Sequence, residues 1–96
     1  MSDAADFRTL LEANHTFPGP YYLSVITVTG DDVFAAVRAA VDAGRAVPTR
    51  DDDWERRASS AARYTSHRVT VVCESADDVV ALYARVRAVI GVVQVL

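Results

Sequence analysis

The most regular feature of the sequence is an alternation of side chains from Tyr64 to Glu74, a run rich in β-branched residues. Neighbouring side chains of a strand point to opposite faces, so every second residue shares a face. The face turned toward a core would carry His67, Val69, Val71 and Cys73. The opposite face would carry Ser66, Arg68, Thr70 and Val72. The alternation therefore predicts the central strand of a small sheet.

Three further strands are predicted. The first runs from Tyr21 to Thr29, after the break made by the Pro18-Gly19-Pro20 segment. Both of its faces carry apolar side chains, with Tyr21, Leu23 and Val25 on one and Tyr22, Ser24, Ile26 and Val28 on the other. A polar edge strand is predicted from Asp53 to Ala58, and a last strand from Val92 to Leu96.

Helical spacing of apolar residues appears in three stretches. The longest runs from Ala76 to Ile90 and includes Ile90 on its buried face; Ser75 opens a capping-box-like motif before it. A second helix is predicted from Asp32 to Ala43, with Asp31 or Asp32 as its cap. A short helix is predicted from Asp3 to Glu12. Gly44 and Gly91 are the expected helix stops.

The order of these elements is a short helix followed by β-α-β-β-α-β. Two helices that must cover one sheet lie side by side on one of its faces, and the crossovers between strands are right-handed. The sequence therefore predicts an α+β fold of ferredoxin-like type, with a four-stranded antiparallel sheet whose first and third strands are central. We expect residues 1–96 to form a single domain, with residues 1–16 as an N-terminal extension that holds the short helix.

Composition narrows the classes of function. The formal net charge of −3 argues against nucleic acid or a membrane surface as the main partner, because both need a basic footprint. The single cysteine excludes an internal disulfide, and two histidines beside it are too few for a structural zinc site. No signal-type segment, membrane-spanning run, catalytic set, metal site or cofactor motif is present, so we expect a cytoplasmic protein that is not an enzyme.

The ordered motifs resemble those of the YbeD-like, or lipoate-regulatory-protein-like, family of small bacterial proteins. Members have Leu-Leu-Glu, then Phe-Pro-x-x-Tyr/Phe, then a basic residue with Pro-Ser-Ser-x-Gly-x-Tyr-x-Ser, then Leu-Tyr, and end in Val-Lys/Arg-Met-Val-Leu. The corresponding segments here are residues 10–12, 17–21, 57–66, 82–83 and 92–96. The resemblance implies a ferredoxin-like fold similar to ACT regulatory domains, in a family without an established function.

This chain departs from the family pattern at several positions. Ser24 replaces a lysine of the first strand, and Val93 replaces a basic residue of the last one. The hairpin proline and glycine are Ala58 and Ala62, and a core-facing aliphatic residue is His67. If the family's basic positions bind a ligand, this chain binds it differently or not at all.

One candidate binding site is a cluster of basic and hydroxyl side chains around the predicted hairpin: Arg57, Ser59, Ser60, Arg63, Tyr64, Ser66 and Arg68. Charge-assisted hydrogen bonds from such groups can hold a small anionic metabolite. The alternative is ordinary turn chemistry, in which serine side chains bond to their own backbone.

A second candidate is the sheet face turned away from the helices, which would present Tyr22, Ile26, Val28 and Val72, with Tyr64 beside them. A run of exposed apolar residues usually marks a contact surface, here for a protein partner or a second copy of the chain. The alternative is that the N-terminal helix covers this face through Phe7, Leu10 and Leu11.

Two other features have both a plain and a functional interpretation. His67 is either a satisfied core residue or a pH-sensitive contact. The run from Asp51 to Asp53 is either a solvated acidic loop or a site for a hard cation. The sequence as a whole predicts a non-enzymatic regulatory or protein-interaction module that self-associates. The alternative function is a small-molecule sensor of ACT type for an amino acid or another anion.

Overall fold

The computed structural model describes the backbone of residues 3–96 and the side chains from Asp6 onward. Its helices are α1 (Asp3–Asn14), α2 (Asp31–Asp42) and α3 (Ala76–Arg87), and a 3₁₀ turn, η1, spans Asp51–Asp53. Its strands are β1 (Gly19–Val28), β2 (Trp54–Ala58), β3 (Tyr64–Cys73) and β4 (Val92–Val95). The order of the elements is the predicted one, with η1 added before β2.

The four strands form one antiparallel sheet in the order β2-β3-β1-β4. The strands β1 and β3 lie in the centre, as predicted, and pair along ten residues each, with Leu23 opposite Val69 and Val25 opposite His67. The shorter strands β2 and β4 form the two edges. The two long strands therefore determine both faces of the sheet.

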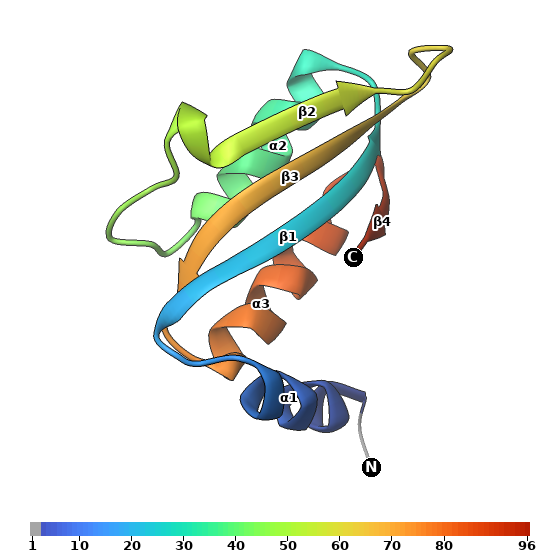
Figure 1. The fold of residues 1–96 in the computed structure, drawn as a ribbon. Helices are drawn as coiled ribbons and strands as arrows, with labels where there is room; N and C mark the ends of the chain where they lie inside the picture. Colours follow the sequence, from blue (N-terminus) through green and yellow to red (C-terminus); the bar gives the residue numbers. More distant parts are fainter. Residues whose placement is uncertain (1–2) are drawn as a thin grey trace.

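Helices α2 and α3 cover one face of the sheet and leave the other open (Figure 1). The covered face carries the buried side chains of β1 and β3, which alternate with exposed ones as the strand pattern predicted. The buried strand side chains are Tyr21, Leu23, Val25, Thr27, His67, Val69, Val71 and Cys73. They meet the apolar stripes of the two helices, which bury Val37, Val41, Val79, Leu82 and Val86. Removal of this apolar surface from water stabilises the domain.

Helix α1 does not cover the open face. It packs at the end of α3, below the sheet in the view of Figure 1. The ring of Phe7 meets the ring of Tyr83 edge-on at 5.1 Å, and Leu11 is buried beside them. Arg8 forms an ion pair of 2.6 Å with Asp77 at the start of α3. These contacts decide between the two sequence-based alternatives in favour of an open sheet face.

The helix ends differ from the prediction in several places, and α1 continues to Asn14 where an end at Glu12 was expected. Helix α3 ends at Arg87, and Ile90, which was placed on the buried face, is 93% exposed. The chain turns at Gly91, where φ is +100° and an added Cβ would lie 3.1 Å from Val33 side-chain atoms, so the turn requires glycine. The cap of α2 is Gly30 without a side-chain hydrogen bond, and Asp31 and Asp32 lie in the first turn. In the first turn their negative charges lie close to the positive end of the helix dipole, which is a favourable interaction.

The edge strand β2 is anchored by its first residue. Trp54 is the strand's buried side chain; its ring meets Phe34 of α2 edge-on at 5.3 Å. The indole N–H donates to the Thr49 hydroxyl at 2.9 Å, and that hydroxyl donates to Asp42 at 2.7 Å. These contacts attach β2 and its preceding loop to α2.

The β2–β3 hairpin turns through Ser59–Arg63, and Ala62 adopts a left-handed backbone with φ of 54°. Glycine adopts this conformation without the steric penalty that a Cβ imposes. The YbeD-like pattern has glycine at this position, so the turn geometry gives a physical reason for that residue.

Candidate functional site

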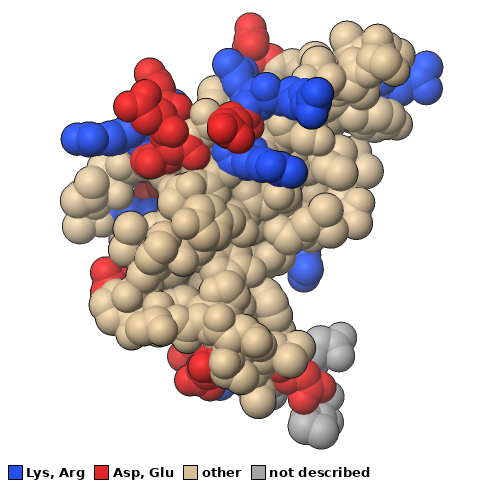
Figure 2. All heavy atoms as spheres, in the orientation of Figure 1, with Lys and Arg blue, Asp and Glu red and all other residues tan. Residues whose placement is uncertain are grey.

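The open sheet face presents the predicted apolar side chains to solvent. Tyr22 is 72% exposed, Val72 is 60% exposed and Val28 is 39% exposed, whereas Ile26 is half-buried. Tyr64 contributes at the upper end, where it pairs with Val28 across the strands. Charged side chains in Figure 2, which has the same orientation, gather mainly near β2 and near α1. Arg68, however, lies on this face in the middle of β3, opposite Ser24.

A further apolar residue of this face was missed by the sequence analysis. Leu96 exchanges backbone hydrogen bonds of 2.7 and 3.1 Å with Ser24 and is 58% exposed. Residues paired in this way share a face of the sheet, so Leu96 lies on the open face beside Ser24 and diagonal to Tyr22. The antiparallel pairing of the last strand with β1, which the predicted topology implied, was the signal that could have placed it.

The basic and hydroxyl side chains of the predicted anion site separate into two groups. Arg57, Ser66 and Arg68 line one hollow of about 660 Å³ on β2 and β3, together with Glu55 and Arg56. The cross-strand register places Arg57 opposite Ser66 and Glu55 opposite Arg68. Three of the seven predicted residues are therefore brought together by the pairing of the two strands.

The other four predicted residues belong to the hairpin. The Ser59 hydroxyl accepts a hydrogen bond of 3.3 Å from the Tyr64 amide, and the Ser59 amide donates to the Tyr64 carbonyl at 2.8 Å. The Arg63 carbonyl accepts a bond from Thr29, which ties the hairpin to the end of β1. Ser60 is exposed at the tip. Ser59 therefore makes the hydrogen bonds to nearby backbone that are typical of serine in a turn.

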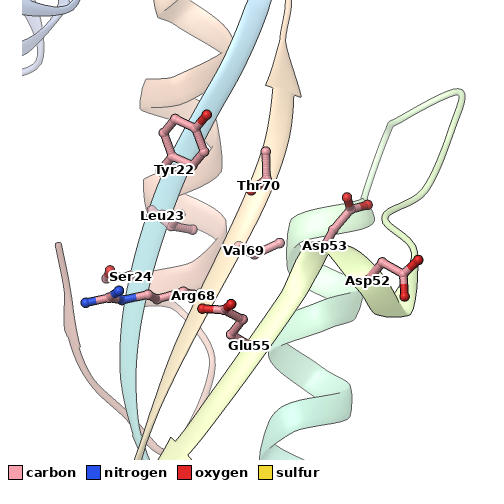
Figure 3. Close-up of a pocket in the computed structure, with 9 residues that line it drawn as sticks. All are labelled: Tyr22, Leu23, Ser24, Asp52, Asp53, Glu55, Arg68, Val69 and Thr70. Carbon is pink, nitrogen blue, oxygen red and sulfur yellow. The ribbon is translucent and has the colours of Figure 1, made fainter.

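A second hollow, of about 460 Å³, adjoins the first on the same side of the sheet. In Figure 3 the Arg68 side chain extends across β1 toward Ser24, and the Glu55 carboxylate points from β2 toward Arg68. The ring of Tyr22 stands farther along β1, and Asp52 and Asp53 lie at η1. Arg68 therefore stands between the two hollows.

His67 lies on the covered face and is 2% exposed. Its Nε2 is 2.9 Å from the Thr27 hydroxyl, which donates to the Val28 carbonyl at 2.8 Å, so Nε2–H is the donor to Thr27. The imidazole stacks on Phe34 at 5.6 Å, and Nδ1 is buried without a hydrogen-bond partner. Burial, assisted by the charge of Arg56, lowers the pKa of His67.

The guanidinium of Arg45 connects α2, β3 and the start of α3. It donates to both carboxylate oxygens of Asp78, at 3.1 and 3.4 Å, and to the Val72 carbonyl at 2.7 Å. Cys73 lies beside it, with Sγ 3.7 Å from an Arg45 nitrogen. Burial, followed by the charge of Asp78, raises the pKa of the Cys73 thiol, which keeps it in the unreactive neutral form.

The acidic run at η1 has structural contacts. Asp51 pairs with Arg38 at 2.6 Å, and Asp53 accepts a hydrogen bond of 2.8 Å from the Arg50 amide. Among the residues that the structure describes, no group of three or more histidine, cysteine or acidic side chains is placed to hold a metal ion. No helix within residues 3–96 has the length and apolar character needed to span a membrane.

Comparison with known proteins gives one match. Residues 12–96 match a family described as a protein of unknown function, DUF493, which is the family of YbeD. Neither the curated proteins nor the solved structures contain a match to this chain. The matched region includes the whole sheet, α2 and α3. The chain therefore belongs to the DUF493 family of proteins of unknown function.

Proposed function

We propose that this protein is a non-enzymatic regulatory or protein-interaction module that acts as a homodimer, with the open face of its sheet as the interface. We also assign it to the YbeD-like branch of its family and to the ferredoxin-like, ACT-like type of fold. The central positions of β1 and β3 and the placement of α2 and α3 on one face support that assignment.

The observation that carries the proposal is the exposure of large apolar side chains on a sheet face that no helix covers. Tyr22 and Val72, which are 72% and 60% exposed, extend from neighbouring central strands. A sheet with helices on one face usually has polar residues on the other. Large apolar side chains that adjoin one another at this end of the open face instead indicate a surface that associates.

A second copy of the chain is the occupant that this face fits. A twofold axis near Tyr22 and Val72 would place this apolar end of the face against its copy. Arg68, in the middle of β3, would then have to remain at the rim of the interface, where it keeps its water. Sheets stack face to face at about 10 Å, with the side chains of both faces interleaved.

The size of the face sets the expected strength of the dimer. Three strands, of which two have ten residues, give a face of ~33 Å by ~14 Å, or ~450 Å² per copy. Stable interfaces bury about 800 Å² per partner, so we expect a weak dimer with a dissociation constant on the order of micromolar or above.

The absence of a catalytic role is also part of the proposal. The cysteine Cys73 and the histidine His67 are 0% and 2% exposed on the covered face. A substrate has no access to either group in this fold. The exposed surface is suited to association.

Sedimentation velocity across a wide range of protein concentration tests the proposal. We expect the wild type to shift from monomer to dimer and Tyr22→Glu to remain monomeric, because the dimer would bury the introduced charge. Leu10→Glu is the matched control, since Leu10 is 62% exposed on α1, away from the sheet face. A wild type that stays monomeric at the highest concentration, or a dimer that Tyr22→Glu leaves intact, would contradict the proposed interface.

A further inference from the structure

The part of the open face between its two apolar ends is polar, because Ser66 and Arg68 of β3 lie there beside Arg57 of β2. We propose that Arg57, Ser66 and Arg68 form a binding site for a small oxyanion, a carboxylate or a phosphate group. The three side chains line one hollow of about 660 Å³, which lies within the size range of small-molecule sites. Ser66 and Arg68 lie on the open face itself, so a dimer that stacks these faces and a bound ligand would compete for part of the same surface.

The pairing of β2 with β3 brings the three groups within reach of one ligand. Arg57 is directly opposite Ser66, and Arg68 follows Ser66 by two residues, so all three point to the same face. Side chains in this diagonal relation start about 7 Å apart. The long arginine side chains span such a distance. Arg68 extends toward Ser24 on β1 in the structure (Figure 3), so a ligand at Ser66 would bind with the Arg68 side chain turned back toward Arg57.

The charges of these arginines are not used by the fold. Among the side chains described from Asp6 onward, the arginines that form ion pairs are Arg8, Arg38 and Arg45. Arg56, which also lines the hollow, places its guanidinium 4.0 Å from the centre of the Phe34 ring. Arg57 and Arg68 therefore keep their hydrogen-bond donors available in a protein whose formal net charge is −3.

The chemistry of the donors selects the ligand class. Each guanidinium presents parallel N–H groups that match the two oxygens of a carboxylate or phosphate, and the serine hydroxyl adds a third donor. Glu55 lines the same hollow and partly offsets the positive charge. Two guanidiniums against one carboxylate leave the site positive, and Glu55 makes its affinity for an anion lower than the arginines alone would give.

Nuclear magnetic resonance titration tests the site with inorganic phosphate and with succinate at constant ionic strength, using the Ser66 amide as the probe. We expect saturable shifts with at least one of the two anions. Arg57→Gln and Arg68→Gln should each weaken binding about tenfold, because each removes a charge-assisted pair. Arg63→Gln is the matched control and should bind as the wild type does, since Arg63 lies in the hairpin outside the hollow.

Glu55→Gln should change the affinity for an anion in the opposite direction from the arginine variants. Removal of the negative charge of Glu55 should tighten the binding of an anion, whereas the same change would weaken the binding of a cationic group. Binding by both anions identifies the shared oxyanion chemistry, and binding by one identifies which group the site selects. No saturable shift with either anion, an equal loss in Arg63→Gln, or weaker binding in Glu55→Gln would overturn the inference. Tyr22→Glu, the variant designed to block dimerisation, should still bind, so failure of the interface and failure of the site are distinguishable.

Discussion

The buried imidazole of His67 makes the stability of this domain depend on pH, and the substitution His67→Leu isolates that effect. In the folded protein Nε2–H donates to Thr27, and the buried Nδ1 has no partner. Protonation would place an N–H and a positive charge at that position, near Arg56 and without an acceptor. Burial and the charge of Arg56 therefore lower the pKa of His67 in the folded state.

The sign and the size of the effect follow from this shift. As pH falls through the ordinary histidine pKa of about 6.5, the unfolded chain binds a proton that the folded one does not, so the free energy of unfolding decreases. It is highest above that pH. The largest decrease in the free energy of unfolding that one such group can cause is about 1.4 kcal/mol for each pH unit below the ordinary histidine pKa. From pH 7.5 to 5.5 the loss from His67 therefore has an upper limit of about 1.4 kcal/mol.

Urea unfolding followed by far-ultraviolet circular dichroism measures this term in the wild type and in His67→Leu. The two proteins differ only at residue 67, so the difference between their pH profiles isolates His67. We expect the variant to gain stability relative to the wild type between pH 7.5 and 5.5. Leucine also restores the aliphatic character that the family pattern has at this position. Parallel profiles would refute the reasoning, because they would mean that His67 binds protons equally in both states.

Two further substitutions test the β2–β3 turn at Ala62 and the ion pair between Arg45 and Asp78. Ala62→Gly should raise the free energy of unfolding by about 1 kcal/mol, because φ is 54° at this position; lower stability by urea unfolding would contradict that explanation. Arg45→Met should lower the free energy of unfolding by about 2 kcal/mol. Asp78 would lose its bidentate partner, and the Val72 carbonyl would lose a hydrogen-bond donor. Arg50→Met, at an arginine outside the ion pairs found here, is the control; equal losses in the two variants would argue against a specific role for Arg45.

The periodicity of the sequence was sufficient to predict the strands and their buried faces, but it was insufficient to predict where the helices end. The alternation from Tyr64 to Cys73 predicted which side chains are buried, because a strand side chain has only two directions to point. Helical spacing continued through Val89 and Ile90, but it could not predict the early turn. That turn depends on the close approach of Gly91 to Val33, a residue of a different helix.

The openness of the sheet face could not be decided from the sequence. Phe7 and Leu11 are apolar and could cover either a sheet or a helix; their contacts with the end of α3 are tertiary. Similarly, the sequence alone does not distinguish Arg57 from Arg63 as a ligand-binding residue. The strand register brings Arg57 to Ser66 and leaves Arg63 in the hairpin. Long-range pairs such as Arg45 with Asp78 gave no local signal, because they lie 33 residues apart.

The anchoring of β2 by Trp54 has a consequence for spectroscopy. Trp54 is the only tryptophan of the chain and is 9% exposed, while the other residues of its edge strand are exposed. Indole emission shifts to longer wavelength when water reaches the ring, so the intrinsic fluorescence reports the attachment of one edge strand. Detachment of β2 would move the emission while the helices remain folded. Fluorescence and helical signals that change at different denaturant concentrations would therefore measure local opening of the sheet edge as a process separate from global unfolding.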